Sequence, residues 1–412
     1  MKFTLTLAAM AAASATAMAA DSLPFHALSY NAKQIKTGDC PTVDSVRDDL
    51  KVLEDFTKEV RIYSVNDCKQ GEPILRAMEN TDWKVQLGLW VGKDDSSYEA
   101  DKKELLRLAG LFDFKKQVSA VIVGNEAVYR EEQTQAQIAA KVKDTKSALT
   151  KLGLGSIPVT TSETWPSIDK TIVDAVDYVN MHAFPFWEGV PIEGAQDKMF
   201  QHIYDIKKIA GTKEVVVGET GWPSDGGNYG DSAPTLQNEK QYMKEFICRA
   251  NLENIRYVWF SAFDEAWKPT TNASDVETHW GILDGDKKPK ITLPMYNCKG
   301  FVPNGTPGEE GESESESNDE SESENNDEGD DSANDSSDAD ESDADGKNDN
   351  DASDGLLDLE SESSDDQSDD TSGPESEETE TSGAMSVTGG NVLSTAAAIA
   401  FSAAALAASS FV

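Results

Sequence analysis

Short apolar runs recur along most of the chain, and longer stretches with a helical spacing of apolar positions separate them. A buried parallel strand reads as a continuous apolar run, whereas an amphipathic helix places apolar residues three and four positions apart. The stretch Val43–Lys58 shows the helical pattern. The apolar positions that fall on one face of this stretch are Val46, Leu50, Leu53 and Phe56. The chain therefore alternates predicted strands with predicted helices.

Eight strand-like runs can be distinguished in this alternation. Strand–helix alternation of this length predicts a parallel sheet of the α/β class. Eight units favour closure into a (β/α)8 TIM barrel over an open doubly wound sheet, and the chain has no GxGxxG fingerprint of a dinucleotide-binding fold. The predicted strands are Phe25–Tyr30, Glu59–Ser64, Lys84–Trp90, Ala120–Gly124, Ile157–Thr161, Tyr178–Ala183, Glu214–Gly218 and Tyr257–Phe263. The other clear helical patterns are Thr134–Leu152 and Leu236–Asn251.

Residues 1–20 have the features of a secretory signal peptide. Lys2 precedes an Ala-rich apolar stretch that ends in Ala17-Met18-Ala19, a small-x-small cleavage pattern. A transmembrane anchor is the alternative, but the stretch is short and no cluster of charged residues follows it. We therefore expect a secreted protein whose barrel domain occupies residues 21–306, a size typical of this fold.

The formal net charge of −40 is concentrated in one segment. Between Glu309 and Glu380 the chain has 33 acidic residues and one basic residue, whereas the remainder has 43 acidic and 35 basic residues, a net charge of −8. This distribution argues against nucleic acid as a partner of the folded part. Residues 307–381 are rich in Ser, Asp and Glu and poor in apolar residues, so we expect a disordered, extended stalk. Calcium binding is the alternative, but the segment has no EF-hand spacing.

Residues 382–412 match the pattern of a signal for a glycosylphosphatidylinositol (GPI) anchor. Three small residues, Ser382, Gly383 and Ala384, precede a short polar spacer and an apolar run from Val392 to Val412. A tail-anchored helix is the alternative. Because the spacer is shorter than usual, the pattern locates the attachment site only to within a few residues. We therefore expect the membrane as a partner, through a lipid anchor, and a cell-surface location on the plasma membrane, in the cell wall or on both.

Four cysteines in a secreted chain suggest two disulfides. Three pairings exist, and we favour Cys40–Cys68 with Cys248–Cys298 because cysteines close in sequence pair easily. A zinc site is not indicated, since the chain has neither a CxxC pair nor a cluster of histidines. The acceptor sequences for N-glycosylation are at Asn272, Asn304 and Asn334.

Two of the apolar runs end in glycine with a glutamate close behind. They are residues 121–126 (VIVGNE) and residues 215–224 (VVVGETGWPS), which contain Glu126 and Glu219. In a barrel the carboxyl ends of all strands meet at one face, so both carboxylates are expected in one cleft. A pair of carboxylates is what glycosidic-bond chemistry requires, one as acid and one as nucleophile or base. Helix capping is the alternative for each glutamate alone, but the pair with its flanking residues favours catalysis.

Aromatic and charged residues follow the ends of other predicted strands. They are Tyr30 and Tyr63 after the first and second strands, Trp187 in a Phe-Pro-Phe-Trp sequence after the sixth, and Glu265 and Lys268 after the eighth. Aromatic rings around acidic groups suit a carbohydrate site, because sugar rings stack their CH faces on aromatic rings while their hydroxyls bind polar groups. The predicted cleft therefore fits a polysaccharide.

Four segments together resemble glycoside hydrolase family 17. They are residues 61–68 (RIYSVNDC), 123–127 (VGNEA), 217–224 (VGETGWPS) and 263–268 (FDEAWK). The similarity runs through nearly the whole predicted barrel, including the order and spacing of Cys40 and Cys68, and GETGWPS is the most specific part. The chain looks closest to the cell-wall β-1,3-glucanases and glucanosyltransferases of fungal and oomycete type.

This resemblance implies a retaining glycosidase with Glu126 as general acid/base and Glu219 as nucleophile. Retention requires the two carboxyl groups to lie only ~5–5.5 Å apart. The resemblance further implies that Asn125 hydrogen-bonds the sugar 2-hydroxyl, and that Glu126 starts protonated because burial and the second carboxylate raise its pKa. The remaining residues expected at the substrate are Tyr30, Tyr63, Trp187, Trp222, Glu265 and Lys268, and the two tyrosines are expected to line the −1 subsite.

Some positions depart from the family pattern or leave two interpretations open. Asn31 follows Tyr30, where many relatives have glycine. His182 fits either a subsite contact or a core histidine with satisfied hydrogen bonds, and we favour the core histidine. Trp90 and Trp259 fit core packing and a role in the site equally well.

The leading hypothesis is a cell-surface endo-β-1,3-glucanase that acts on wall glucan. A β-1,3-glucanosyltransferase would share every catalytic residue and pass the glycosyl unit to another glucan instead of to water. A catalytically inactive wall-binding surface protein is the alternative from another class, and the intact Glu126 and Glu219 argue against it. We expect no metal or organic cofactor, no nucleic-acid partner, and a monomer.

Overall fold

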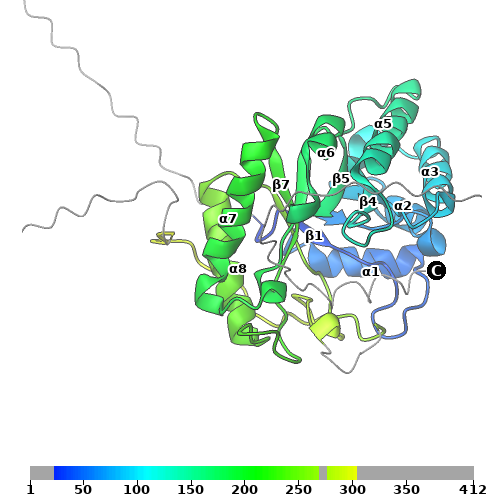
Figure 1. Cartoon of the computed structure of the whole chain (residues 1–412). Coiled ribbons are helices and arrows are strands. Elements are labelled where there is room, and N and C mark those ends of the chain that lie inside the picture. Colours follow the sequence, from blue (N-terminus) through cyan, green and yellow to red (C-terminus); the bar gives the residue numbers. More distant parts are fainter. Residues whose placement is uncertain (1–22, 269–275, 304–412) are drawn as a thin grey trace, which may run out of the picture. The chain divides into compact units, whose positions relative to one another are not determined.

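The computed structural model describes residues 23–268 and 276–303, which form a closed barrel of eight parallel strands (Figure 1). The strands follow one another around the barrel in chain order, and the last pairs with the first, which confirms the predicted (β/α)8 barrel. The strands are β1 (Ala27–Ser29), β2 (Glu59–Arg61), β3 (Lys84–Leu89), β4 (Val118–Asn125), β5 (Val159–Thr164), β6 (Val179–His182), β7 (Val215–Thr220) and β8 (Tyr257–Trp259). The predicted signal peptide, stalk and anchor signal and the glycosylation sites Asn272, Asn304 and Asn334 lie outside the described residues.

Helices connect successive strands and cover the outside of the barrel (Figure 1). Their inward faces are apolar because a parallel sheet needs a cover on its outer side. In the first helix, for example, Val46, Leu50 and Leu53 are buried. The α-helices are α1 (Val43–Leu53), α2 (Gly71–Ala77), α3 (Ser96–Ala109), α4 (Phe114–Gln117), α5 (Gln135–Lys151), α6 (Lys170–Ala175), α7 (Ile192–Ala210) and α8 (Leu236–Leu252). Short 3-10 helices are η1 (Asp67–Lys69), η2 (Trp165–Ser167), η3 (Pro185–Glu188) and η4 (Val276–Thr278).

The predicted helix Val43–Lys58 ends earlier than its apolar pattern suggested. α1 stops at Leu53, and the chain turns so that the backbone N–H of Phe56 donates to the carbonyl of Leu53. The hydroxyl of Thr57 then donates to the carbonyl of His26 at 3.3 Å, just before β1. Phe56 is still buried. The apolar pattern therefore predicted burial correctly, while the end of the helix depended on a turn.

Side-chain caps define the start of α1 and α5. The hydroxyl of Thr42 accepts from the backbone N–H of Ser45, and the Ser45 hydroxyl accepts from the N–H of Thr42. Thr134 and Gln137 form the same capping box at the start of α5. Such caps satisfy N–H groups that have no partner within the helix and contribute about 1 kcal/mol each. They fix where the loops after β1 and β4 end, and these loops carry predicted site residues.

The eighth predicted strand, Tyr257–Phe263, is shorter in the structure because the backbone after Trp259 changes its partner. The N–H of Ser261 donates to the carbonyl of Trp280, and the N–H of Ile282 donates to the carbonyl of Ser261. The segment after residue 275 therefore lies beside the carboxyl end of β8. This arrangement brings Trp280 to the same end of the barrel as the predicted site.

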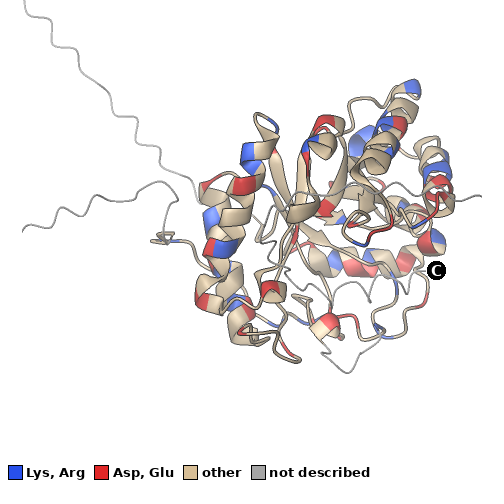
Figure 2. Cartoon of the chain, in the orientation of Figure 1, with Lys and Arg blue, Asp and Glu red and all other residues tan. Residues whose placement is uncertain are grey.

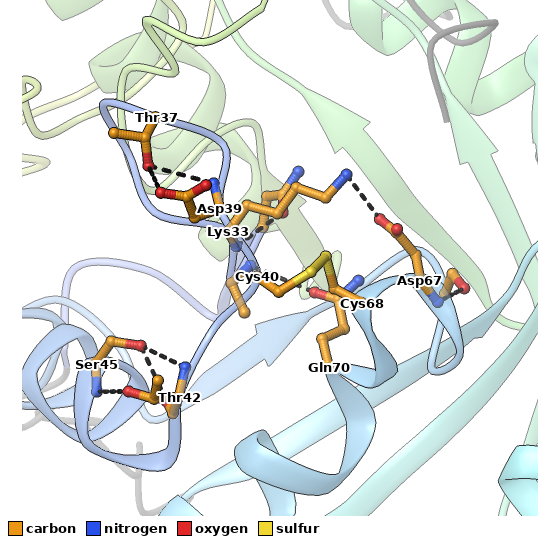
Figure 3. The surroundings of a disulfide bond; sticks show 12 residues. Lys33, Thr37, Asp39, Cys40, Thr42, Ser45, Asp67, Cys68 and Gln70 are labelled. Carbon is orange, nitrogen blue, oxygen red and sulfur yellow. Dashed lines mark hydrogen bonds and ion pairs between the residues drawn. A yellow bond between two sulfur atoms is a disulfide. The ribbon is translucent and has the colours of Figure 1, made fainter. Parts of the chain in front are cut away.

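Both predicted disulfides are present. Cys40–Cys68 links the loop after β1 to η1, which follows β2 (Figure 3). Cys248–Cys298 links α8 to the C-terminal part of the described chain. Each disulfide therefore fastens an irregular segment to the barrel.

Lys and Arg side chains are interspersed with Asp and Glu along the outer helices (Figure 2). Arg256 pairs with Glu214 at 2.6 Å, and Arg107 pairs with Glu104 at 2.6 Å. This mixture is expected from the near balance of 43 acidic and 35 basic residues outside the acidic segment. Within residues 23–268 and 276–303, no helix is both long enough and apolar enough to cross a bilayer.

Candidate active site

The carboxyl ends of the strands form an open cleft whose lining is both acidic and aromatic. Barrel enzymes build their active sites at this end, where the loops that follow the strands supply the side chains. The lining contains the carboxylates Glu126, Glu219, Glu265 and Glu277, the amine of Lys268, and the rings of Tyr30, Tyr63, Trp90, Phe184, Trp187, Phe260, Phe263, Trp267 and Trp280. The two predicted glutamates thus lie in one cleft.

Glu219 lies in β7 and is held by Arg61 of β2. Arg61 Nη1 donates to Glu219 Oε1 at 2.7 Å and to the carbonyl of Gly218 at 2.9 Å. The Arg61 side chain is 1% exposed and that of Glu219 is 7% exposed, so this is a buried, charge-assisted contact. Arg61 therefore fixes one oxygen of Glu219 and balances its charge, while Glu219 still lines the cleft.

Glu126 directly follows β4 and has a left-handed backbone conformation, with φ of 55°. Residues other than glycine rarely adopt this region, and such strain concentrates at functional sites. The backbone N–H of Glu126 donates to the carbonyl of Ser162 in β5 at 2.8 Å, which holds the turn. One carboxylate oxygen of Glu126 lies within 4.8 Å of one of Glu219, so both can reach the same sugar.

Burial raises the pKa of Glu126 above its usual value, although the positive charges of Arg130 and Arg61 act in the opposite direction. The side chain is 19% exposed, so it is largely removed from water and yet open to the cleft. A raised pKa favours the protonated form in mildly acidic solution, and a general acid must carry a proton. The surroundings of Glu126 therefore suit the predicted acid.

His182, at the end of β6, lies between the two glutamates and is completely buried. Its Nδ1 lies 2.9 Å from Glu126 Oε1, and its Nε2 lies 3.1 Å from Arg61 Nη1. Burial lowers the pKa of His182 to about 3; Glu219 opposes this shift and Arg61 adds to it, so the ring is neutral. His182 is therefore a buried histidine with a partner on each ring nitrogen, as the core interpretation expects, and those partners are the site residues Glu126 and Arg61.

Asn125 is oriented by the same arginine. Its Oδ1 accepts a hydrogen bond from Arg61 Nη2 at 2.5 Å, which leaves the amide NH2 group as the donor for a ligand. Asn125 lines the cleft next to Glu126, where the sequence placed it. A sugar hydroxyl against this amide would therefore accept a hydrogen bond.

The loop after β8 and η4 supply a second charged group. Lys268 pairs with Glu265 at 2.8 Å and lies 4.0 Å from Glu277, which was not predicted from the sequence. Burial by itself lowers the pKa of Lys268, but the two carboxylates outweigh it and the pKa is raised. Glu265 and Lys268 line the cleft as predicted, and Lys268 remains a cation that can donate to substrate hydroxyls.

Tyr30 and Tyr63 both line the cleft but differ in what their hydroxyls contact. The hydroxyl of Tyr30 donates to Asp49 Oδ2 at 2.7 Å, so Tyr30 offers the cleft only its ring. The Arg61 guanidinium lies 4.9 Å from the ring centre of Tyr63, within the range of a cation–π contact. The Tyr63 hydroxyl is buried and interacts with the side chain of Ser29.

The tryptophans considered from the sequence divide between the cleft and the core. Trp187 and Trp90 line the cleft. Trp222 is fully buried, and its indole N–H donates to the carbonyl of Ala233 at 2.9 Å. The prediction that Trp222 contacts substrate is therefore corrected. Its ring packs on Phe186, which in turn packs on the cleft residue Trp187. Trp259 is also completely buried and belongs to the core.

A buried glutamate beneath the turn after β4 was not predicted. Glu163 of β5 accepts hydrogen bonds from the backbone N–H groups of Val128 and Tyr129, at 3.1 and 3.4 Å. Burial raises its pKa to about 8. Glu163 therefore anchors the turn that carries Glu126, although nothing in its local sequence distinguishes it from an exposed strand residue.

Other site residues were missed for two different reasons. Arg61 lies in one of the quoted motifs, and an arginine at the end of a buried apolar strand needs a partner for its charge, which is a usable signal. Glu277 and Trp280 follow no predicted strand. They reach the cleft only because the segment after residue 275 folds back beside β8, and no local pattern predicts this.

Glu126, His182 and Glu219 meet one geometric condition for a metal site, because one ligand atom of each lies within 4.8 Å of the others. The Arg61 guanidinium, however, already donates to Glu219 Oε1 and faces His182 Nε2. A divalent cation there would meet a fixed positive charge and compete for the same lone pairs. The donor set therefore fits a protonatable pair of carboxylates better than a metal centre.

Chemistry on a glycosidic bond needs a proton donor and a nucleophile or base placed around one sugar, and this cleft supplies both. The protein is a glycoside hydrolase. Residues 27–281 match the BtgE/BtgC glycoside hydrolase domain, and the chain belongs to that family.

Proteins of similar sequence carry names that agree with this assignment. A glucan 1,3-beta-glucosidase from Candida albicans is 32% identical over 279 residues, which cover 64% of this chain and 89% of that protein. A probable glucan endo-1,3-beta-glucosidase from Aspergillus fumigatus is 31% identical over 286 residues, which cover 63% of this chain and 41% of that protein.

Solved structures also match. The crystal structure of a glycoside hydrolase family 17 β-1,3-glucanosyltransferase from Rhizomucor miehei is 31% identical, with a TM-score of 0.60, and the match covers 67% of this chain and 97% of that chain. An active-site mutant of the Rhizomucor miehei enzyme in complex with laminaritriose is 30% identical, with the same TM-score and coverage. The resemblance to family 17 is thereby confirmed.

Proposed function

We propose that this protein is a retaining endo-β-1,3-glucanase that hydrolyses cell-wall β-1,3-glucan through a covalent glycosyl-enzyme. The observation that carries the proposal is the closeness of Glu126 and Glu219, which bring carboxylate oxygens within 4.8 Å of each other. Retaining glycosidases have their carboxyl groups about 5–5.5 Å apart, whereas inverting ones leave about 6.5–9.5 Å for a water molecule. The short separation supports direct attack by one carboxylate on the sugar.

In the first step Glu219 attacks the anomeric carbon, and Glu126 protonates the departing glycosidic oxygen. Arg61 occupies Oε1 of Glu219, so Oε2 is the oxygen left for attack. Burial raises the pKa of Glu126, which favours the proton that this step consumes. The carbon–oxygen bond to the leaving glucan breaks as the bond to Glu219 forms, and the leaving glucan departs with the proton.

In the second step the ionised Glu126 removes a proton from water, which attacks the anomeric carbon and releases Glu219. Two inversions at one carbon restore the β configuration. Asn125 is oriented by Arg61 so that its NH2 group can donate to the 2-hydroxyl of the sugar. Contacts to this hydroxyl strengthen in the transition state and so accelerate both steps.

The cleft walls suit a neutral glucan. The rings of Trp187, Trp267 and Trp280 line the cleft, and the partly exposed ring of Trp267 can stack on a sugar face. The charge of Lys268 is balanced by Glu265, so both groups can bind hydroxyls without requiring a charged substrate. The names of the Candida and Aspergillus relatives and the laminaritriose complex support a β-1,3-linked glucan as the substrate.

A β-1,3-glucanosyltransferase is the second candidate, and it is favoured by the Rhizomucor miehei structures. Both reactions share the first step and the glycosyl-enzyme. They differ in the second step, where the hydroxyl of another glucan replaces water as the acceptor. Glu126 would deprotonate either acceptor in the same way.

The length of the products distinguishes these reactions. The full chain is incubated with a linear β-1,3-gluco-oligosaccharide labelled at its reduced end, and product length is followed over time. Shorter products alone support the hydrolase, and products longer than the substrate support the transferase. No change of this or any other β-glucan would contradict both and favour a wall-binding protein. Proton NMR of the fresh products should show the β-anomer first, and an α-anomer would contradict retention.

We further propose that the protein is secreted and held at the cell surface by a GPI anchor. The two disulfides support this location, because disulfides persist in oxidising compartments. The patterns of residues 1–20 and 382–412 support it as well. Phosphatidylinositol-specific phospholipase C should release the protein from membranes of the producing cells. Retention under conditions that release other anchored proteins would contradict the anchor.

A further inference from the structure

The ring of His182 makes two contacts that the mechanism above does not use. Nδ1 lies 2.9 Å from Glu126 Oε1, and Nε2 lies 3.1 Å from Arg61 Nη1. Nε2 also lies 3.6 Å from Glu219 Oε1, which is beyond hydrogen-bond distance. The ring is completely buried, so water does not compete for either nitrogen.

Arg61 determines which nitrogen of His182 carries the proton. A guanidinium has no acceptor, so a hydrogen on Nε2 would point at the Arg61 cation 3.1 Å away. A neutral histidine without a hydrogen on Nε2 carries it on Nδ1, and this N–H then donates to Glu126 Oε1. A second proton on the ring is strongly disfavoured, because burial lowers the pKa of His182 to about 3. In the other tautomer the Nε2–H of His182 would face the N–H groups of Arg61, so the Nδ1–H tautomer is the one that fits.

We propose that His182 is a positioning residue that fixes Oε2 of Glu126 as the oxygen that carries the catalytic proton. This proposal rests on the proposed role of Glu126 as the general acid/base. Oε1 accepts the Nδ1–H of His182 more strongly as a carbonyl oxygen than as a hydroxyl oxygen, so this contact disfavours a proton on Oε1. The proton of neutral Glu126 therefore lies on Oε2. The same oxygen gives the proton to the leaving glucan and later takes one from water.

The same contact opposes the effect of burial on Glu126. A hydrogen bond donated to a carboxylate stabilises its charged form. His182 therefore limits how far burial raises the pKa of Glu126, and it assists formation of the carboxylate that the second step needs. Loss of the donor should raise this pKa further.

Charged and titratable groups from several elements also act on Glu126. They are Arg61 of β2, Tyr129 and Arg130 of the turn after β4, Glu163 of β5, Glu219 of β7 and Glu277 of η4. The neutral ring of His182 can be replaced by another neutral side chain without changing the charge of this set. A shift caused by such a replacement therefore reports the lost hydrogen bond.

Two kinds of substitution separate the donor from the bulk of the ring. In His182→Asn the side-chain NH2 group can replace Nδ1–H, whereas His182→Leu and His182→Phe fill the space without a donor. We expect the basic limb of the kcat/KM profile on a β-1,3-gluco-oligosaccharide to move up by about one pH unit in the Leu and Phe variants. It should stay near its wild-type position in His182→Asn. A limb that moves equally in all three variants, or in none, overturns the proposal.

A second measurement does not depend on activity. The pKa of Glu126 is read from the carbon-13 signal of its labelled carboxyl group, which is assigned by its disappearance in Glu126→Gln. This pKa should rise by about one unit in the folded Leu or Phe variant and change little in His182→Asn. An unchanged pKa in a Leu or Phe variant that unfolds at the same temperature as His182→Asn overturns the proposal. If the pKa rises while the wild type acts on no glucan, the hydrogen bond is supported and only the proposed function fails.

Discussion

Glu219 and Glu126 are the same residue type in one cleft, and their neighbours give them different properties. Glu219 accepts a hydrogen bond from the cation Arg61 at 2.7 Å, whereas Glu126 lies 2.9 Å from the neutral ring of His182. Arg61 balances the charge of the buried Glu219, whereas burial raises the pKa of Glu126. The proposed division into nucleophile and acid therefore follows from the Arg61 contact of Glu219 and from the burial of Glu126, and not from the residue type.

Glu219→Gln removes the proposed nucleophile and keeps the size of the side chain. We expect kcat/KM on β-1,3-gluco-oligosaccharides to fall by a factor on the order of 10³ or more, because an amide cannot form the glycosyl-enzyme. Binding of the same oligosaccharide, measured by calorimetry, should persist. The matched control is Glu193→Gln in α7, an exposed residue that should keep the wild-type rate. Full turnover by Glu219→Gln would remove Glu219 from the mechanism.

Glu126 should control the basic side of the pH profile. Because burial raises its pKa above the usual 4.5, kcat/KM should be high while Glu126 is protonated and should fall as the pH rises through that value. Glu126→Gln should slow hydrolysis of oligosaccharides and remove this basic limb. An aryl glycoside with a good leaving group needs no acid, so it should still form the glycosyl-enzyme. Rates for the two substrates across pH provide the measurement, and a basic limb that survives in Glu126→Gln would assign the acid to another residue.

The sequence identified the two glutamates because strand ends converge in a barrel, but it could not identify their partners. Arg61 and His182 come from β2 and β6, and only closure of the barrel brings them beside β7. Trp222 shows a second limit of prediction from sequence. It lies in the most specific motif of the chain, yet its ring points into the core, and a motif does not specify the direction of each side chain.

At the level of elements, local pattern predicted the existence of strands better than their ends. A buried parallel strand has a strong local signal, its apolar run, and all eight predicted strands overlap observed ones. The end of β8 at Trp259 depends instead on hydrogen bonds to Trp280, which lies in a separate segment. Such long-range pairing leaves no mark on the local sequence.

The two disulfides fasten different elements and should have different effects on activity. Cys40–Cys68 joins the loops after β1 and β2 (Figure 3). Cys68 and Asn66 line a polar pocket beside the cleft. Cys248–Cys298 joins α8 to the C-terminal segment, and neither of its cysteines lines the cleft. We therefore expect the first disulfide to affect substrate binding as well as stability, and the second to affect stability alone.

Double alanine variants test this difference. Each should lower the free energy of unfolding by about 4 kcal/mol through the entropy of the unfolded chain, since the bridges span 28 and 50 residues. Cys40→Ala/Cys68→Ala should also raise KM for long oligosaccharides, and Cys248→Ala/Cys298→Ala should not. Thermal unfolding and steady-state kinetics on both variants give the comparison. Equal KM values for the two variants would contradict the proposed role of the first disulfide.

At the level of the whole molecule, buried carboxyl groups tie the stability of the barrel to pH. Glu239 of α8 is completely buried, and burial raises its pKa to about 8 although Lys290 lies 3.6 Å away. Burial also raises the pKa of Glu163 to about 8. An unfolded glutamate titrates near 4.5, so the folded state binds more protons between these values. Stability therefore falls as the pH rises from about 4.5 to 8, by at most about 1.4 kcal/mol per pH unit for each group.

Glu239→Gln removes this ionisation and keeps the side-chain volume. We expect the variant to unfold at a higher temperature than the wild type at pH 8, by roughly 2–4 °C for each kcal/mol gained, and at a similar temperature near pH 4.5. Calorimetry across this range provides the measurement. Some pH dependence should remain in the variant because Glu163 still titrates. A variant less stable than the wild type at pH 8 would show that the charge of Glu239 stabilises the fold.

The central claim is that Glu219 forms the covalent bond to the sugar, and trapping that bond tests it most directly. A laminaribiosyl fluoride with fluorine also at carbon 2 slows both steps and lets the glycosyl-enzyme accumulate. Proteolysis and mass spectrometry then locate the label. We predict one labelled side chain, Glu219, and no labelling of the Glu219→Gln variant. A label on Glu126, or hydrolysis of the parent oligosaccharide to α-anomers without any label, would contradict the account.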